Sequence, residues 1–400
     1  MFPEAMKPQN STSESHRSWW SSLAAVWRTE FGFVFRDAGV LIFFFALPLF
    51  YPLIYTLIYN PETVKDIKVA VVDQCRTARS RELTRMVDAT DAISVYAQLP
   101  TVDDARRMEN NHEIYGILYI PADYDKNIGR GQQANVVFYS DMSLLLRYRA
   151  FISALTEVQL AIGSDIRTET MDKLGSIGSM ISTPEVSQDA VMIGDPTQGF
   201  ASFIIPGIVI LILQQSMLLG ITMLAAGSSE RRRRNGHIDP LAANASPLST
   251  VLGKALCYVV IYIPLTLYVI HLVPEMFSLP HIGSVWQELL FLMPMLFASA
   301  FLGLALSVFV TERESSMLVI VFTSVFLLFL SGLTWPRYAM SGFWTLVGDC
   351  VPAIWGMEGF IRINSNGSTL AEESHAFTMM WVLTAVYFVL AWLLARYRRR

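Results

Sequence analysis

The residue types that carry catalysis are present in this sequence, but they do not form any known catalytic pattern. Gly253-Lys254-Ala255 lacks the earlier glycine and the following hydroxyl residue with which a P-loop wraps a phosphate. The predicted strand that ends at Asp73 is followed by Gln-Cys-Arg, so the glycine-rich turn of a dinucleotide-binding site is missing. The patterns HExxH, GxSxG and CxxC are also absent. We therefore expect no enzymatic activity and no bound cofactor in this chain.

The sequence also lacks a clear metal-binding pattern. The three cysteines, Cys75, Cys257 and Cys350, are too few for a disulfide framework and lack the spacing of a metal site. His271 and Glu275 lie four residues apart, so they can share one face of a helix. Two such residues at a helix end mark a membrane interface more often than a metal site. We expect no metal.

Gln214 and Gln215 are the most deeply placed polar residues, at the centre of a long apolar run. Polar side chains within a membrane are costly and usually face the interior of a helix bundle. The two glutamines either line a pathway or hydrogen-bond a neighbouring helix, and the second reading is favoured. No Asp, Glu, Lys or Arg lies at the centre of any apolar run. This disfavours an ion-driven carrier, which generally needs a titratable group there.

Six apolar runs must position these residues. Hydrophobic residues make up 53% of the 400 residues and charged residues only 16%, whereas soluble proteins carry nearer a quarter charged residues. Each run is close to the roughly 20 residues that cross a bilayer as a helix. The sequence therefore predicts an all-α polytopic membrane protein with six transmembrane helices. The runs are 38–59, 200–226, 251–274, 289–310, 315–334 and 376–395.

The distribution of Lys and Arg predicts the orientation. Arg231 to Arg234 follow the second run, the C-terminus is rich in arginine, and the short loop 275–288 has no Lys or Arg. Because basic residues stay on the cytoplasmic side, both termini are expected in the cytoplasm, with the chain in the inner (plasma) membrane. Segments 60–199 and 335–375 then lie outside. The alternative, that the arginines bind nucleic acid, is disfavoured by their place beside a membrane helix.

The N-terminal region is expected to lie on the cytoplasmic surface. Residues 1–18 are polar and predict a disordered tail. Residues 19–37 mix aromatics with spaced charges, which is typical of an amphipathic helix at the membrane interface. A plain extension of the first crossing helix is the alternative. The first run leads into Asn60-Pro61-Glu62, which is no cleavage site, so we expect it to stay as an anchor.

The segment 60–199 predicts an α/β domain inserted between the first and second crossing helices. Its pattern alternates between the periods of strands and helices, as in small layered α/β structures. Residues 174–199 are rich in Gly, Ser and Pro and predict a linker. The expected strands are 67–73, 93–97, 114–121 and 134–140, and the expected helices are 77–90, 101–110 and 142–173.

The predicted cytoplasmic loop 227–250 is compact and charged. Such a loop is what a soluble motor protein would bind, although the same composition also serves membrane orientation alone. The residues that we expect to make such a contact are Glu230, Arg231, Arg232, Arg233, Arg234, Gly236 and Asp239.

Nearly the whole chain resembles a type-2 ATP-binding-cassette (ABC) transporter permease, which has one helix, a large outer domain and five further helices. The most specific match is Leu330-Ser331-Gly332, Trp335-Pro336, Met340 and Pro352, within 330–362. A weaker match in the loop 230–254 keeps Gly236, Leu241 and Gly253-Lys254. This loop departs from the family pattern in its arginines, in His237 and in Asn244-Ala245.

The resemblance implies partners and a mechanism. Two cytoplasmic ATPase subunits would bind ATP and Mg, the loop 227–250 would contain their contact, and a second copy or a paralogous permease would complete a dimer. The segment 335–375 would dip back from the outer face and close the exit, with Ser331, Gly332, Trp335, Pro336, Met340 and Pro352 shaping it. A proline after Trp335 would also end the fifth helix there.

The leading hypothesis is therefore the permease subunit of an ABC exporter, and the outer domain resembles those that meet a periplasmic membrane-fusion adaptor. The alternative is a non-transporting membrane scaffold that organises envelope proteins through its outer domain. No motif in the sequence identifies a substrate.

Overall fold

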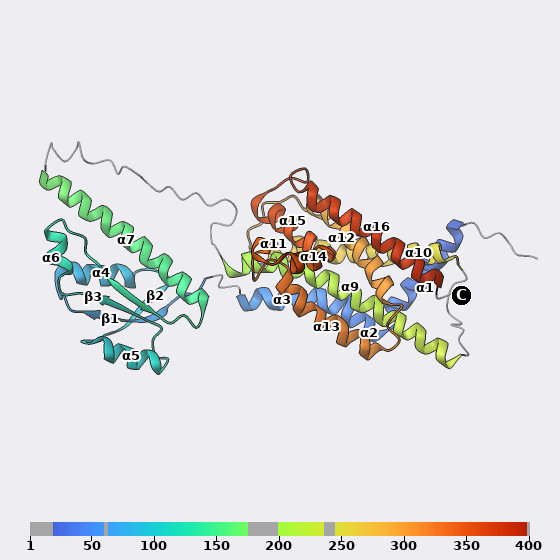
Figure 1. Cartoon of the computed structure of the whole chain (residues 1–400), viewed down its shortest axis with the longest axis horizontal. Coiled ribbons are helices and arrows are strands. Elements are labelled where there is room, and N and C mark those ends of the chain that lie inside the picture. The colour runs from blue at the N-terminus through green and yellow to red at the C-terminus, as the bar shows by residue number, and fades with distance from the viewer. Residues whose placement is uncertain (1–18, 60–62, 175–198, 236–244, 398–400) are drawn as a thin grey trace, which may run out of the picture. The chain divides into compact units, whose positions relative to one another are not determined.

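A computed structural model describes residues 19–59, 63–174, 199–235 and 245–397 (Figure 1). The chain divides into two compact units. One comprises Met1–Asn60 and Met192–Arg400 and is helical, and the other comprises Pro61–Val191 and contains a sheet. In sequence, the second unit falls between the helices Ala38–Tyr59 and Phe200–Arg234.

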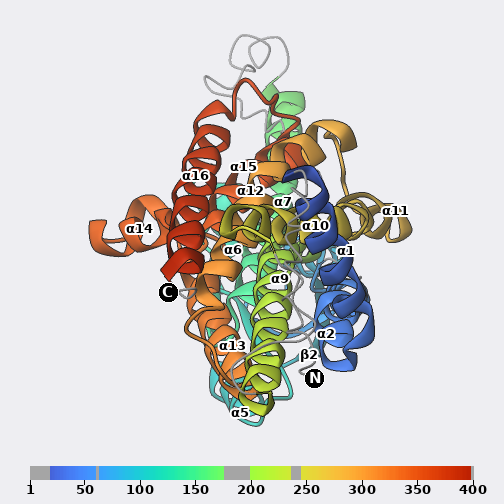
Figure 2. The same cartoon turned by 90° about the vertical axis from the view of Figure 1, so that its right-hand side faces the viewer.

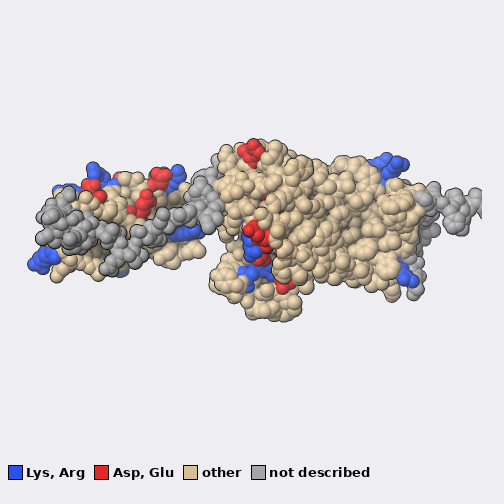
Figure 3. Space-filling view, turned by 90° about the horizontal axis from the view of Figure 1, so that it is seen from above, with Lys and Arg blue, Asp and Glu red and all other residues tan. Residues whose placement is uncertain are grey.

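Among the described residues of the first unit, six helices are long and apolar enough to cross a membrane. They are Ala38–Tyr59, Phe200–Arg234, Pro247–Met276, Val285–Leu306, Arg313–Leu330 and Ser374–Tyr397. Figures 1 and 2 show them running side by side. On the face drawn in Figure 3, the charged side chains of this unit lie toward its two ends, with an uncharged stretch between them. This distribution suits a bundle that spans a hydrocarbon layer.

Helix α9 (Phe200–Arg234) is the centre of the bundle. In its most apolar stretch 83% of the residues are buried, against 22% in the first, fifth and sixth spans. Its 35 residues make it roughly 50 Å long at 1.5 Å per residue. That exceeds a hydrocarbon core about 30 Å thick. One end of α9 must therefore project beyond the apolar layer, and its last turns carry the four arginines.

The first span is assembled from three pieces, which are α2 (Ala38–Leu41), a π-helical turn η1 (Ile42–Ala46) and α3 (Leu47–Tyr59). The π turn places Phe44 against α9 where Gly220 leaves room. A Cβ on Gly220 would lie 1.6 Å from the Phe44 ring, so no larger residue fits. Phe44 also contacts Tyr258 and Tyr262 edge-on, which joins the first span to the third.

Helix α1 (Trp19–Arg36) precedes the first span and packs along α10 (Pro247–Leu267), as Figure 2 shows. Its buried residues are Val26, Glu30 and Val34, which recur every fourth residue and so form one stripe. Gly253 allows the close approach, because a Cβ there would lie 3.0 Å from Val26. The third span continues from α10 through a π turn, η3 (Tyr268–Leu272), into α11 (Val273–Met276).

The remaining helices close the bundle. The fourth, fifth and sixth spans are α12 (Val285–Leu306), α13 (Arg313–Leu330) and α16 (Ser374–Tyr397). Between α13 and α16 lie a short 3-10 turn η4 (Arg337–Ala339), α14 (Gly342–Asp349) and α15 (Pro352–Asn366). Helix α15 packs against α9, α12 and α16. Gly356 and Gly359 permit this, because a Cβ at either would fall within 2.6 Å of Met295 or Phe291.

In its described residues, the second unit is a four-stranded sheet with helices on both faces. The elements are β1 (Ile67–Asp73), α4 (Ala78–Asp88), β2 (Ile93–Gln98), α5 (Val102–Asn110), β3 (Gly116–Ile120), α6 (Tyr124–Gly129), β4 (Val137–Ser140) and α7 (Leu145–Leu174). The strand order is β2-β1-β3-β4, with β1 parallel to β2 and β3, and β4 antiparallel to β3 at the edge. One core lies between the sheet and α4 with α7, and a smaller one lies under α5 (Figure 1). Helix α6 was not expected from the sequence.

The largest difference from the sequence-based boundaries concerns the segment 227–250. Helix α9 continues to Arg234 instead of ending at 226, and α10 begins at Pro247. The helix therefore takes up Glu230 and the four arginines, which the sequence assigned to a loop. The tail 1–18 and most of the linker 174–199 lie outside the described residues.

Candidate functional site

The basic end of the helical unit contains the first group of candidate residues. Glu230 and Arg231 to Arg234 occupy the last turns of α9, while Gly236 and Asp239 lie outside the described residues. Because helical residues point in successive directions, the four arginines cannot all face one partner. Arg233 lies 3.6 Å from Glu312, and Arg231 lies over the Phe33 ring, 4.7 Å from its centroid.

Arg313 joins three helices at this end. Its two terminal nitrogens donate to the two carboxylate oxygens of Asp37, at 2.9 and 2.6 Å, and its Nε lies 3.8 Å from Glu230. Asp37 also accepts from the amides of Gly39 and Val40 and so caps the start of α2. Partial burial would raise the pKa of Asp37, but the hydrogen bonds from Arg313 and these amides outweigh burial and lower that pKa below its ordinary value.

A second ion pair fixes α1 to α10. Glu30 is buried, its carboxylate lies 2.9 Å from the Lys254 ammonium, and the Tyr258 hydroxyl donates to it. A buried carboxylate is tolerated only when paired and hydrogen-bonded, and Glu30 has both partners. This role is not visible in the sequence, where Glu30 looks like one of the spaced charges of an amphipathic helix.

A cavity of about 200 Å³ opens beside this ion pair. Residues of α1, α9, α10, α12 and α16 line it, among them Glu30, Ser228, Arg231, Arg232, Lys254 and Ala391. The lining is mixed, with charged residues from α1, α9 and α10 and small or apolar residues from α12 and α16. The basic residues recognised in the sequence thus include two that border a cavity, and not only a surface.

At the other end of the bundle, the family-like residues of the outer segment form the turn that ends α13. Ser331 donates to the Leu328 carbonyl at 2.6 Å and accepts from the Leu333 amide. Gly332 has a φ of 92°, in the left-handed region that favours glycine. Trp335 is 59% exposed, and Pro336 begins the 3-10 turn that Met340 ends. Pro352 is the first residue of α15.

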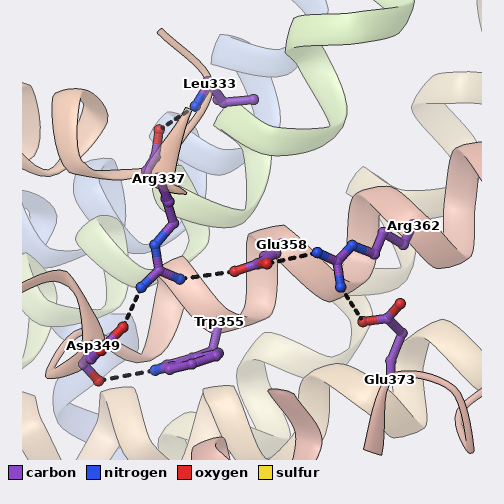
Figure 4. A network of polar contacts seen from close by, with 8 residues as sticks. Leu333, Arg337, Asp349, Trp355, Glu358, Arg362 and Glu373 are labelled. Carbon is purple, nitrogen blue, oxygen red and sulfur yellow. Dashed lines mark hydrogen bonds and ion pairs between the residues drawn. The ribbon is translucent and has the colours of Figure 1, made fainter. Parts of the chain in front are cut away.

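After this turn, Arg337 takes part in a network of charged side chains (Figure 4). Arg337 binds Asp349 at the end of α14 and Glu358 in α15, the latter at 2.8 Å. Arg362 extends the network by contacting Glu358 at 2.7 Å and Glu373 at 3.3 Å. The network joins the 3-10 turn, α14, α15 and the segment before α16 to one another. Its members are separated by up to 36 residues in sequence, and sequence reasoning singled out none of them.

Gln214 connects α9 to this outer segment. Its side-chain oxygen accepts from the Ala353 amide in the first turn of α15 at 2.7 Å and from Ser299 of α12 at 3.3 Å. The first amides of a helix have no partner within that helix, so Gln214 acts as a cap supplied by another helix. This arrangement agrees with hydrogen bonding to a neighbouring helix. Gln215 is also buried, and neither of its polar atoms has a partner within the described residues.

One buried acid lies within a span, which the sequence did not indicate. Glu288 is fully buried in the first turn of α12, and its carboxylate lies 3.2 Å from His281 in the loop before that helix. The hydrogen bond with Glu288 raises the pKa of His281 above its ordinary value, against the opposing effect of burial. His271 and Glu275 pair at 3.6 Å. Among the described residues, no group of three or more His, Cys, Asp or Glu side chains could hold a metal ion.

These features define a polytopic membrane protein with one long apolar helix before a folded α/β unit and five after it. The family model for ABC-2 family transporter proteins matches residues 38–393, which is most of the chain. The chain therefore belongs to this family, as the resemblance in its outer segment indicated. Membership implies a membrane component of an ABC transporter that works with an ABC ATPase subunit. No curated protein matches the chain significantly.

Proposed function

We propose that this chain is the permease subunit of an ABC exporter, moving its substrate out across the inner membrane. A separate cytoplasmic ATPase subunit supplies the energy by binding ATP and Mg²⁺ and hydrolysing the ATP. Membership of the ABC-2 family supports a permease role, and the direction and the coupling route are our inference. The basic end of the bundle is then cytoplasmic, together with both termini, because arginine-rich ends stay on that side.

The observation that supports this mechanism best is that α9 is connected to both ends of the bundle. Near its basic end, Glu230 lies beside Arg313. At its centre, Gln214 caps α15, which the Arg337 network joins to α14. A movement of α9 imposed by an ATPase that binds at its basic end would therefore pull on the helices of the outer segment. We infer that this segment, 335–375, closes the exit and opens when α9 moves.

A second copy of the chain, or a paralogous permease, completes the pathway. The exposed face of α13 is the surface that we assign to it. Leu318, Phe322 and Phe329 are 60–71% exposed there, and Thr323 is also exposed. Helices associate in membranes through close packing and small polar residues, so an apolar face with Thr323 suits a partner helix. The α/β unit then lies outside the membrane, where it is placed to contact a periplasmic adaptor.

Co-purification tests the ATPase contact. The full chain, tagged and extracted from native membranes, should retain an ABC ATPase in stoichiometric amount and stimulate its turnover. Replacing Arg231 to Arg234 by Gln together with Asp239→Asn should reduce ATPase recovery by about tenfold or more, because several charged contacts are lost at once. Membrane insertion should be unchanged, as judged by the amount of chain in the membrane fraction.

A matched control removes positive charge from the C-terminus instead, by replacing Arg396, Arg398, Arg399 and Arg400 with Gln. This variant should keep the ATPase. Equal recovery of the ATPase by both variants would show that the contact is elsewhere. Stable purification of the unaltered chain without any ATPase would count against export and in favour of a membrane scaffold.

A further inference from the structure

The loop 277–284, between the third and fourth spans, lies against the C-terminal end of α15. The amide of Ile282 donates to the Asn364 carbonyl at 2.9 Å. Gly283 makes a second close approach, because a Cβ there would lie only 2.8 Å from the Ile363 carbonyl oxygen. The loop therefore meets α15 through its backbone, at a position where a side chain would push the two apart.

The same loop contains His281, which reaches a buried carboxylate. Nε2 of His281 lies 3.2 Å from Oε2 of Glu288, which is fully buried in the first turn of α12. The other oxygen, Oε1, has no hydrogen-bond partner among the described residues. A Cβ on Gly283 would lie 2.3 Å from this Oε1, so the loop backbone covers it. A carboxylate away from water is costly unless a cation and hydrogen bonds compensate it, and His281 is placed to supply both.

The neighbouring elements η3, α11 and α15 place further charged or histidine side chains around the loop, and these pair with one another. His271 of η3 has its ring centroid 6.2 Å from that of His281, but it pairs with Glu275 of α11 at 3.6 Å. On α15, Arg362 binds Glu358 at 2.7 Å. The pairing of His281 with the buried carboxylate of α12 is thus separate from the other ion pairs at this end of the bundle.

We propose that His281 and Glu288 form a proton-controlled latch that holds the loop 277–284 against α12 and the end of α15. With both ring nitrogens protonated, His281 is a cation that donates to the Glu288 carboxylate, so the buried charge is balanced. When the imidazole loses this proton, the carboxylate keeps its charge but loses its counter-ion. The loop then separates from α12, because hydration by water is the remaining way to compensate the carboxylate.

The pKa of His281 sets the direction of the pH dependence. The hydrogen bond with Glu288 raises this pKa above the ordinary value of 6.5, against the opposing effect of burial, and the charge of Glu275 also raises it. The latch therefore contributes its full stabilisation below the ordinary value and loses it as the pH rises through the raised pKa. The loop should be held in acidic solution and released in alkaline solution.

The latch acts on α15, which belongs to the segment 335–375. If this segment closes the exit, as proposed above, release of the loop would remove one of the contacts that keep it closed. That consequence rests on the proposed function, whereas the latch itself does not. It is tested on the chain without an ATPase or a transported substrate, so failure of the latch and failure of the export proposal are distinguishable.

Hydrogen exchange of the full-length chain in detergent, followed by mass spectrometry, tests the latch. The amide of Ile282 reports on the loop, because its acceptor is on α15. Exchange is compared at about pH 5.5 and about pH 9, on either side of the ordinary histidine pKa. Each rate is divided by that of an unstructured peptide of the same sequence at the same pH. Protection of the loop should fall about tenfold or more at the higher pH, as expected when a charge-assisted hydrogen bond is lost. Equal protection at both pH values would overturn the proposal.

Two histidine variants locate the titrating group. His281→Gln cannot titrate but keeps a side-chain N–H donor, so the protection of the loop should become the same at both pH values. His271→Gln is the matched control, because it removes the neighbouring imidazole and leaves the latch intact. This control should keep the full pH dependence. Loss of the pH dependence in His271→Gln, or its survival in His281→Gln, would show that His281 is not the controlling group.

Two further variants separate the charge from the packing. Glu288→Gln removes the buried charge at nearly constant shape, so the loop should stay protected at both pH values. Gly283→Ala keeps both charged groups, but its Cβ would displace the loop from Glu288 and from the Ile363 carbonyl. Protection should then be low at both pH values. An unchanged pH dependence in either variant would contradict the latch.

Discussion

Individual charges decide how the ends of this bundle are held. Arg313 and Asp37 are 276 residues apart in sequence and meet through two parallel hydrogen bonds. At the opposite end, Arg337 donates one hydrogen bond to Asp349 and one to Glu358. A bidentate pair such as Arg313–Asp37 fixes orientation as well as distance, so it sets the angle between the helices that it joins. At this scale the charged residues join helices to one another and do more than mark topology.

Variants of Asp37 separate its two roles. Asp37→Asn keeps a side-chain oxygen that can cap α2 but loses the charge that binds Arg313, and should cost about 1–3 kcal/mol. Asp37→Ala loses the cap as well and should cost about 1 kcal/mol more. Thermal unfolding of the purified chain in detergent, followed by tryptophan fluorescence, measures both. Equal melting temperatures for the two variants would exclude the capping role.

The pKa of Asp37 gives this prediction a pH dependence. Its pKa is lower in the folded chain than in the unfolded chain, so its contribution to stability is present above the ordinary carboxyl value of 3.8. That contribution is lost as the pH falls through the lower, folded-state pKa. In Asp37→Asn, which cannot titrate, the part of the pH dependence that comes from this group should disappear.

At the scale of elements, apolar runs predicted that six crossing helices exist, but not where they end. Glu230 to Arg234 are polar, so hydropathy alone stops the second span near 226, whereas the backbone continues as helix to Arg234. Glycines such as Gly220 and Gly359 explain which helices approach closely, but their partners, Phe44 and Phe291, are far away in sequence. Tertiary contacts of this kind leave no local signal.

The two central glutamines illustrate the same limit and supply an element-scale prediction. Gln214 caps α15, whereas Gln215 is buried without a described partner. Gln214→Met should destabilise the chain by about 1–3 kcal/mol, because the Ala353 amide and Ser299 lose their acceptor. Gln215→Met should be neutral or stabilising, because it replaces unpaired polar atoms with apolar ones.

Hydrogen exchange adds a local measurement to the comparison. In Gln214→Met the amides at the start of α15, including Ala353, should exchange faster. In Gln215→Met the exchange rates of the same amides should not change. Faster exchange in both variants would mean that α15 responds to any change in this part of α9. Loss of stability only in Gln215→Met would show that Gln215 has a polar partner, such as water, and that the roles assigned to the two residues are wrong.

For the whole molecule, the sequence predicted the class correctly because composition, run length and the outer motif all depend on local residues. The family match over residues 38–393 confirms that assignment. The proposed orientation of the bundle and the proposed second copy are properties of an assembly, and a single chain carries only the surfaces that would take part in it. The exposed apolar faces of α3, α13 and α16 are alike in composition, so sequence does not tell which faces lipid and which faces protein.

Cysteine cross-linking distinguishes these faces. In a variant lacking the three native cysteines, Phe322→Cys on the exposed face of α13 should cross-link between copies with a short bifunctional maleimide. Val386→Cys, which is 53% exposed on α16, is the matched control and should remain monomeric on denaturing gels. The physical reason is that a reagent spanning a few ångströms joins only residues that lie in a stable interface.

The two positions also test the assignment against its alternatives. Cross-linking at position 386 but not at position 322 would place the second copy on α16 and contradict the assignment of α13. Equal, weak cross-linking at both would indicate collisions in the membrane instead of a dimer. If the chain pairs with a paralogue instead, Phe322→Cys should yield no product of twice the chain mass, because the reagent joins two thiols and two copies of this chain would not meet.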